Sequence, residues 1–177
     1  MAEINRGCLQ VYTGNGKGKT TAALGLCLRA AGHGYRSHII QFMKGQIDYG
    51  ELKAVNYLEG LIRITQGGRS CFVRREDPDP VDVDLARKAL ELAGKEIKER
   101  SADILVLDEL SVALDFKLVE LEDVMELIKS RPHSMELLIT GRAAHPEVIE
   151  AADLVTEMKE IKHYYRQGIG CRTGIEN

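Results

Sequence analysis

The chain has 177 residues, of which 44% are hydrophobic and 29% are charged, and its formal net charge is −3. This length suits one globular domain with a sizeable core, so we expect residues 1–177 to form a single domain. The weakly acidic balance argues against binding to nucleic acid by electrostatics alone, and no apolar run is long enough to cross a membrane.

The ends and the cysteines of the chain carry no sign of export. The first residues lack the apolar core of a signal peptide, and the four cysteines are scattered without a C-x-x-C pair. We therefore expect a cytoplasmic protein with neither a disulfide framework nor a zinc site.

Short apolar runs alternate with longer helical patterns along the whole chain. The runs predict strands over residues 8–12, 37–42, 61–65, 104–108, 136–140 and 154–157. The patterns predict helices over residues 20–31, 51–58, 81–100, 120–129 and 146–151. This alternation is typical of an α/β fold, a mostly parallel sheet flanked by helices. The first helix is apolar on nearly every side, so we expect it to be buried against the sheet and to end at Gly32-His33-Gly34.

A glycine-rich segment joins the first predicted strand to the first helix and reads Thr13-Gly14-Asn15-Gly16-Lys17-Gly18-Lys19-Thr20-Thr21. Glycines let successive backbone N–H groups turn inward, and the N-terminus of the helix adds partial positive charge, so such a loop cradles phosphates. Lys19 would supply a mobile, exposed cation, and the hydroxyl of Thr20 or Thr21 could ligate Mg²⁺. The usual pattern has glycine at the position of Thr13, but the rest is intact. The segment predicts binding of a nucleoside triphosphate.

A second nucleotide motif follows the predicted strand 104–108, which ends in Asp108 and Glu109. A buried strand beside a phosphate loop usually places its acid on the Mg²⁺ shell, directly or through water. Successive side chains of a strand point to opposite faces, so the two acids are expected to have different roles. Glu109 would either hold the metal or orient a water molecule for phosphate hydrolysis.

Residues 66–80 have no sustained periodicity and predict a long surface loop. This loop, the phosphate loop, Asp108-Glu109 and Gly141-Arg142 all follow predicted strands, so they should converge at the carboxyl edge of the sheet, where α/β proteins bind ligands. Arg142 would reach the phosphates or a nearby acid there, with a surface salt bridge as the alternative. Lys44, after the second strand, presents the same two alternatives.

Taken together, these segments resemble the P-loop family of ATP:corrinoid adenosyltransferases, also called cob(I)alamin adenosyltransferases. The matching motifs are Gly-Asn-Gly-Lys-Gly-Lys-Thr-Thr at residues 14–21, Arg-Ala-Ala-Gly-His-Gly at 29–34, Gln-Phe-Met-Lys-Gly at 41–45, Leu-Asp-Glu-Leu at 107–110 and Thr-Gly-Arg at 140–142. The closing segments at residues 150–153, 162–164 and 174–176 also look like the family. The resemblance covers almost the whole chain in order, which a phosphate loop alone would not explain.

The resemblance implies a RecA-like P-loop fold, commonly assembled as a homodimer. It implies transfer of the 5′-deoxyadenosyl group of ATP to the Co(I) of a reduced corrinoid, with release of triphosphate, in cobalamin biosynthesis or salvage. ATP would lie in a reversed orientation, with the ribose 5′-carbon facing the corrinoid. A separate reductant, of flavodoxin type or another kind, would supply Co(I). By this resemblance, Lys19 and Glu109 act in catalysis, Thr20, Asp108 and Glu109 hold Mg²⁺, and the nucleotide contacts residues 14–21, Arg29, Lys44 and Arg142.

The chain departs from the family in the loop after the third strand. Better-known members carry a Phe-x-Trp pair there that is thought to displace the lower ligand of cobalt. Aligned on Gly68, the two positions hold Arg69 and Cys71, and Phe72 could substitute after a shift of one residue. We therefore expect Phe72 to serve the corrinoid. We also expect the N-terminal extension that some relatives fold over the site to be missing.

Two other classes of function fit the phosphate loop. A plain ATPase or GTPase would use Glu109 to activate water and Arg142 to sense the γ-phosphate. A nucleotide-dependent interaction module would bind single-stranded DNA, as RecA-like folds can. The acidic balance and the lack of a basic stripe with interleaved aromatic residues disfavour the second alternative.

Overall fold

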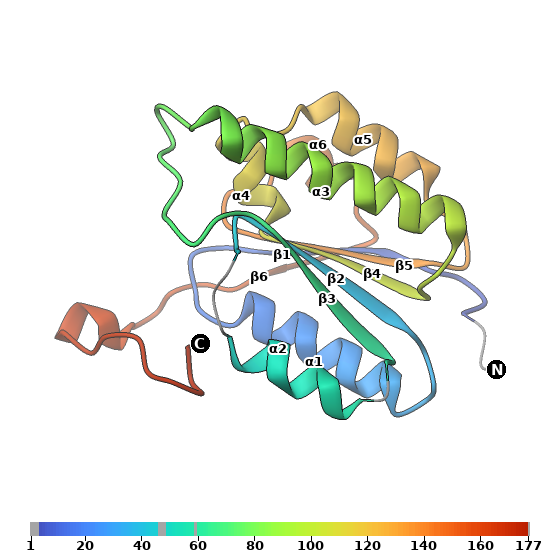
Figure 1. The fold of residues 1–177 in the computed structure, drawn as a ribbon, viewed down its shortest axis with the longest axis horizontal. Coiled ribbons are helices and arrows are strands. Elements are labelled where there is room, and N and C mark those ends of the chain that lie inside the picture. The colour runs from blue at the N-terminus through green and yellow to red at the C-terminus, as the bar shows by residue number, and fades with distance from the viewer. Residues whose placement is uncertain (1–3, 46–48, 59, 177) are drawn as a thin grey trace.

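The computed structural model describes residues 4–45, 49–58 and 60–176, which form an α/β fold (Figure 1). Its strands are β1 Leu9–Thr13, β2 Ser37–Phe42, β3 Ile62–Gly67, β4 Ile104–Asp108, β5 Glu136–Thr140 and β6 Leu154–Glu157. Its helices are α1 Lys19–Ala31, α2 Gly50–Ala54, α3 Pro80–Glu99, α4 Leu110–Asp115, α5 Leu121–Ser130 and α6 Pro146–Ala151, with 3₁₀ turns η1 Val55–Tyr57 and η2 Tyr164–Gln167.

The six strands form one sheet in the order β3-β2-β4-β5-β1-β6, and every neighbouring pair is parallel. All residues of β2 and β4 are buried, because helices cover both faces of the sheet at its centre. The predicted fold class is therefore confirmed.

The predicted elements agree with the structure apart from a few boundaries and two omissions. Strands β2, β4, β5 and β6 and helix α6 have the predicted bounds, whereas β3 runs two residues further, to Gly67. The predicted helix 51–58 is divided into α2 and η1. Helix α4 and the turn η2 were not predicted, and both are too short to show a helical periodicity.

Helices α3, α4, α5 and α6 lie on one face of the sheet, and α1 and α2 lie on the other (Figure 1). Helix α1 packs against the sheet as predicted, but through one of its sides only. Ala23 and Cys27 are buried there, whereas the Leu28 side chain is 57% exposed. Gly34, with φ +81°, provides the left-handed residue after the helix, and the amides of Gly34 and Tyr35 bond to the last carbonyls.

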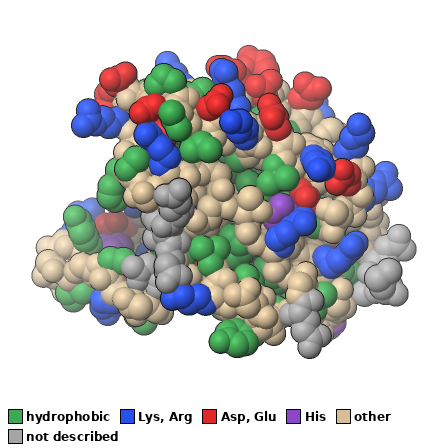
Figure 2. Space-filling view, in the orientation of Figure 1, with side chains coloured by type: hydrophobic (Ala, Val, Ile, Leu, Met, Phe, Trp, Pro, Cys, Tyr) green, Lys and Arg blue, Asp and Glu red, His purple; other side chains and the backbone are tan. Residues whose placement is uncertain are grey.

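Acidic and basic side chains are interspersed over the side of the molecule that carries α3 and α5 (Figure 2). That side therefore presents no extended field of one sign. Among the helices of the described residues, none has the length and apolar character needed to span a membrane.

The carboxyl ends of the parallel strands meet at one edge, called here the ligand edge. The phosphate loop follows β1 there, Glu109 follows β4, and the predicted long loop follows β3 and ends where Asp79 caps α3 by accepting a bond from the Val81 amide. The loops after β2 and β3 touch, since a Cβ atom on Gly45 would lie 1.7 Å from the Gly68 carbonyl oxygen. Only glycine permits this approach, which brings the loop that carries Lys44 against the loop after β3.

Candidate active site at the ligand edge

The phosphate loop begins at Gly14 and leads into α1 through Gly18. Both glycines have positive φ angles, +92° at Gly14 and +118° at Gly18. The loop is tied to the segment after β6, because the Gly16 amide donates to the Met158 carbonyl at 2.6 Å. The sequence suggested an exposed Lys19, but this side chain is buried. Its ammonium donates to the carbonyls of Gly14 and Gly16 at 2.6 and 2.8 Å. An ammonium has three donors, so Lys19 stabilises the loop and keeps capacity for a phosphate.

Asp108 is fully buried at the end of β4 and accepts hydrogen bonds from three side chains. Its Oδ1 accepts from Thr20 Oγ1 at 2.9 Å and from Thr140 Oγ1 at 2.7 Å. Its Oδ2 accepts from Lys44 Nζ at 2.8 Å. Burial alone would lower the pKa of Lys44, but Asp108, with Glu109 and Glu51 adding to it, raises the pKa. The aspartate thus joins the phosphate loop to the ends of β2 and β5.

Glu109 is the first residue after β4 and has a left-handed backbone, with φ +64°. Its amide donates to Thr140 Oγ1 at 3.0 Å. Burial, followed by the neighbouring Asp108, raises the pKa of the Glu109 carboxyl, while Lys44, Lys19 and Arg142 oppose the rise. The two adjacent acids have different surroundings, because Asp108 is enclosed by three side-chain donors, whereas Glu109 follows the strand and lines both clefts.

Two clefts of about 540 Å³ each open on either side of Glu109. The first is lined by residues 15–21 of the phosphate loop, and the second by apolar side chains that include Phe42, Val112 and Phe116. Four side chains line both clefts: Lys44, Tyr49, Glu109 and Arg142. A polar ligand and a largely apolar ligand could therefore meet across this shared wall.

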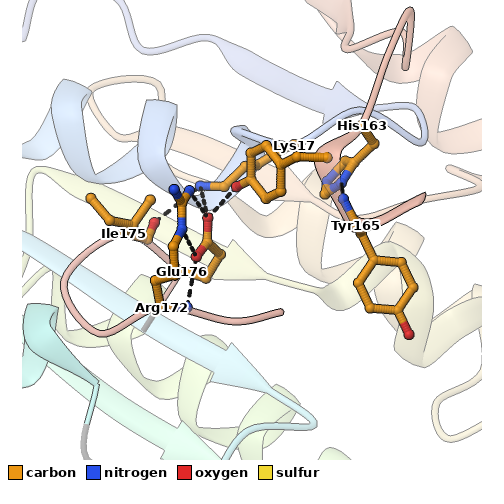
Figure 3. A network of polar contacts seen from close by, with 7 residues as sticks. Lys17, His163, Tyr165, Arg172, Ile175 and Glu176 are labelled. Atoms are coloured by element: carbon orange, nitrogen blue, oxygen red, sulfur yellow. Dashed lines mark hydrogen bonds and ion pairs between the residues drawn. The ribbon is translucent and has the colours of Figure 1, made fainter. Parts of the chain in front are cut away.

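The C-terminal segment contributes another wall of the first cleft (Figure 3). Lys17 Nζ donates to the Ile175 carbonyl at 3.1 Å and lies 3.9 Å from a Glu176 carboxylate oxygen. Arg172 and Tyr164 hold that carboxylate, and their hydrogen bonds lower the pKa of Glu176 to about 2. The first and last segments of the chain thus lie side by side at the cleft.

A family model described as ATP:corrinoid adenosyltransferase BtuR/CobO/CobP matches residues 5–177. The chain belongs to this family. A corrinoid adenosyltransferase of Pseudomonas aeruginosa is 36% identical over 176 residues, which cover 99% of this chain and 86% of that protein. A corrinoid adenosyltransferase of Escherichia coli is 33% identical over 176 residues, covering 99% and 88%.

The fold also resembles a solved structure of more distant sequence, a KaiC-like protein from Pyrococcus horikoshii. The TM-score is 0.61 at 19% identity, over 89% of this chain and 75% of that one. At this identity the likeness supports the RecA-like P-loop architecture of the adenosyltransferase and nothing further.

The ligand edge of this adenosyltransferase brings together most of the residues that the sequence singled out. Asn15, Gly16, Lys17, Gly18, Lys19, Thr20, Thr21, Lys44, Glu109 and Arg142 line the first cleft, Gly14 binds Lys19, and Phe72 lines the second cleft. Arg29 is the exception. It lies in the last turn of α1, about 15 Å along the helix from Lys19 at 1.5 Å per residue, and it does not line the cleft.

Several residues at the site were not expected from their sequence context. Tyr49 lies beside Lys44, with the ammonium 5.6 Å from its ring centroid, and Thr140 binds Asp108 from β5. His163 was expected to have a structural or surface role, yet it lines the first cleft together with residues 174–176. The motif matches at residues 162–164 and 174–176 were the available signal, although they did not reveal a position at the cleft.

The oxygen atoms at this edge fit a magnesium ion bound chiefly by phosphates and water. The Thr20 hydroxyl donates a hydrogen bond to Asp108, so the lone pairs of the Thr20 oxygen remain available to the first cleft. Glu109 lines the same cleft. Both oxygens of Asp108 are engaged by side-chain donors. No cluster of three or more His, Cys, Asp or Glu side chains suited to a metal occurs in the part of the chain that the structure describes. Mg²⁺ usually keeps several waters and is held by one or two carboxylates together with substrate phosphates, so Thr20 and Glu109 are the side chains here that could contribute to such a site.

Proposed function

We propose that this protein transfers the 5′-deoxyadenosyl group of ATP to the Co(I) of a reduced corrinoid and releases inorganic triphosphate. Membership of the ATP:corrinoid adenosyltransferase family supports this assignment. The structural observation that carries it is the pair of clefts with a shared wall of Lys44, Tyr49, Glu109 and Arg142. ATP would occupy the first cleft and the corrinoid the second, so that their reacting atoms meet at Glu109.

The reaction needs alignment more than activation. The electron pair of Co(I) attacks the 5′-carbon, the cobalt–carbon bond forms, and the carbon–oxygen bond to the triphosphate breaks with its electrons on the departing oxygen. Holding the two substrates in line across the shared wall can contribute about 7–11 kcal/mol to lowering the barrier. Residues that fix both substrates are therefore the principal catalytic device.

The second requirement is to stabilise the charge on the departing triphosphate. Lys19, Lys17 and the amides of the phosphate loop would hold the phosphates, and Arg142 would add a permanent positive charge from the shared wall. Mg²⁺, held by Thr20 and Glu109 with Asp108 acting through Thr20 or through water, would neutralise phosphate charge. Phe72, whose side chain is fully exposed in the second cleft, is an aromatic residue that could contact the corrinoid face.

The chemistry also places requirements on partners. Transfer consumes the electron pair of Co(I) and returns none, so a separate reductant must supply each Co(I), and we propose a flavodoxin-type or similar cytoplasmic donor. We propose a homodimer as the assembly, which size-exclusion chromatography with light scattering would test. A monomeric mass at micromolar concentration would contradict it.

The reaction is tested anaerobically with Mg-ATP and chemically reduced cobalamin. We expect a light-sensitive adenosylcobalamin spectrum and one triphosphate for each adenosylated cobalt. Release of ADP and orthophosphate with an unchanged cobalt spectrum would overturn the proposal and favour a plain ATPase with Glu109 activating water. A control with Lys19→Met separates catalysed transfer from background chemistry.

A further inference from the structure

Thr140, the last residue of β5, is fully buried, and its hydroxyl contacts both the Asp108 carboxylate and the Glu109 backbone of the second nucleotide motif. Its Oγ1 lies 2.7 Å from Asp108 Oδ1 and 3.0 Å from the backbone nitrogen of Glu109. β4 and β5 are parallel neighbours with Leu107 opposite Ile139, so this contact continues their register by one residue. The hydroxyl therefore connects two strands where both meet the ligand edge.

The direction of each hydrogen bond follows from its partners. The Glu109 amide can only donate, so the Thr140 oxygen accepts from it. The single proton of Thr140 is then available for Asp108 Oδ1, which already accepts from Thr20. The hydroxyl has no rotational freedom left, and it prescribes where both the Asp108 oxygen and the Glu109 backbone lie.

Both of those positions have consequences in the first cleft. Because the Thr20 hydroxyl donates its hydrogen bond to Asp108, its lone pairs are left for the first cleft, which Thr20 lines. The backbone of Glu109 is left-handed, with φ +64°, a region that is unfavourable for residues with a side chain. The hydrogen bond from the Glu109 amide to the Thr140 hydroxyl stabilises this conformation. That turn directs the Glu109 carboxylate to the wall shared by the two clefts.

We propose that Thr140 is a positioning residue of the transfer site: its hydroxyl fixes the Asp108–Thr20 pair and the left-handed turn at Glu109. The inference rests on the proposed adenosyl transfer. Thr140 touches neither substrate in this arrangement, since it is fully buried beneath Asp108 and lines neither cleft. It acts through the orientation of the residues above it.

The test compares Thr140→Val, which keeps the shape and removes the hydroxyl, with Thr140→Ser, which keeps the hydroxyl. Loss of groups that orient metal ligands typically costs about 10- to 100-fold. We expect Thr140→Val to lower kcat/KM for Mg-ATP by that factor and to leave KM for the corrinoid unchanged. Thr140→Ser, which keeps the hydroxyl, should retain most of the wild-type kcat/KM. Ile139→Val, a buried neighbour on the same strand, is the matched control and should lower the melting temperature without changing kcat/KM.

Two further readouts do not depend on turnover. A fluorescent ATP analogue should bind Thr140→Val more weakly than wild type with Mg²⁺ present, and equally well when EDTA removes the metal. In the wild type, hydrogen exchange at the Glu109 amide should be slow, and in Thr140→Val it should be fast. If the valine variant does not fold, Thr140→Ala takes its place, and the wild-type exchange rate still tests the bond.

Kinetics of Thr140→Val equal to wild type would overturn the proposal, as would fast exchange at the Glu109 amide of the wild type. A serine variant as impaired as the valine variant would also overturn it, because the methyl group would then be what matters. A wild-type enzyme that forms no adenosylcorrinoid would instead refute the proposed function, while nucleotide binding and exchange would still report on Thr140.

Discussion

At the scale of single residues, the ligand edge is built from charged side chains whose partners are fixed within the protein. Lys19 is buried against two loop carbonyls, and Asp108 accepts from Thr20, Thr140 and Lys44. Removing one partner of such a buried set leaves a buried polar atom with one hydrogen bond fewer, which costs more than the loss of an exposed salt bridge. Residues that serve the reaction therefore also contribute to the stability of the loop.

Lys19→Ala should reduce kcat/KM for ATP by about 10²- to 10³-fold, the loss typical of one donor to a developing negative charge. It should also lower the melting temperature, because the Gly14 and Gly16 carbonyls lose a donor. Steady-state kinetics and thermal melts monitored by circular dichroism measure both effects. Lys17→Ala is the comparison, since Lys17 is more exposed and should affect stability little. Retained activity with a native spectrum would remove Lys19 from its catalytic role.

At the scale of elements, the ligand edge depends on two irregular segments, the loop between β3 and α3 and the segment after β6. The loop is anchored by Arg69, whose guanidinium donates to both Asp82 oxygens at 2.8 and 2.6 Å and to Asp79 at 3.2 Å. This anchor on the start of α3 engages Arg69 and leaves Phe72 exposed at the second cleft. The segment after β6 supplies a wall of the first cleft.

Phe72→Ala should slow the reaction with cobalamin more than the reaction with a corrinoid that has no lower ligand, by a factor of about ten. The physical reason is that an aromatic ring at the corrinoid face can displace the lower ligand, a step that the second substrate does not need. Stability should not change, because the side chain is exposed. Parallel kinetics with both corrinoids measure the ratio, and equal slowing would exclude this role for Phe72.

Truncation after Gly170 removes Ile175 and Glu176 from the wall of the first cleft, together with Arg172, which holds the Glu176 carboxylate. We expect KM for ATP to rise severalfold, about three- to tenfold, while KM for the corrinoid is unchanged. Glu160→Gln is the control, because it disturbs the Glu160–Arg166 pair of the same segment away from the cleft. An unchanged KM for ATP would show that the C-terminal wall does not contact the nucleotide.

At the scale of the whole molecule, polar groups are also buried away from the ligand edge, between the sheet and α3. His38 on β2 lies 2.8 Å from Thr65 Oγ1 and 3.4 Å from Glu96 of α3, and Arg63 pairs with the same glutamate at 2.8 Å. Burial, followed by the positive charge of Arg63, lowers the pKa of His38. Burial would raise the pKa of Glu96, but hydrogen bonding from Ser101 and the charges of His38 and Arg63 lower it.

These two pKa directions predict how stability depends on pH. Below about pH 6.5, the usual His pKa, the unfolded chain binds a proton at this histidine that the folded protein resists, so the free energy of unfolding should fall as the pH is lowered. Glu96 adds a further loss below about pH 4.5. Urea unfolding between pH 8 and pH 5 measures the first effect, and His38→Gln should reduce the slope. A slope that is the same in both proteins would contradict the prediction.

The fold could be predicted because apolar runs and helical periodicity are local, and so are the motifs at residues 14–21 and 107–110. Helix α4 was not predicted, because it begins after a left-handed Glu109 and no capping residue in the sequence marks that start. The contacts of Thr140 were not predicted, because its partners lie at the end of the neighbouring strand and Asp108 is 32 residues away in sequence. Burial of Lys19 and the wall at residues 174–176 are likewise products of contacts between segments that are distant in sequence.

The position of β1 has a consequence for how the protein is made. β1 carries the phosphate loop, but its two neighbours in the sheet are β5 and β6, which come from the last part of the chain. During synthesis on the ribosome, β2, β3 and β4 can pair while β1 still lacks both neighbours. The first cleft, which is also lined by His163 and residues 174–176, can therefore be complete only after β5, β6 and the C-terminal segment have emerged. We expect the nascent chain to bind a nucleotide late, so that the nucleotide does not guide the early folding of the sheet.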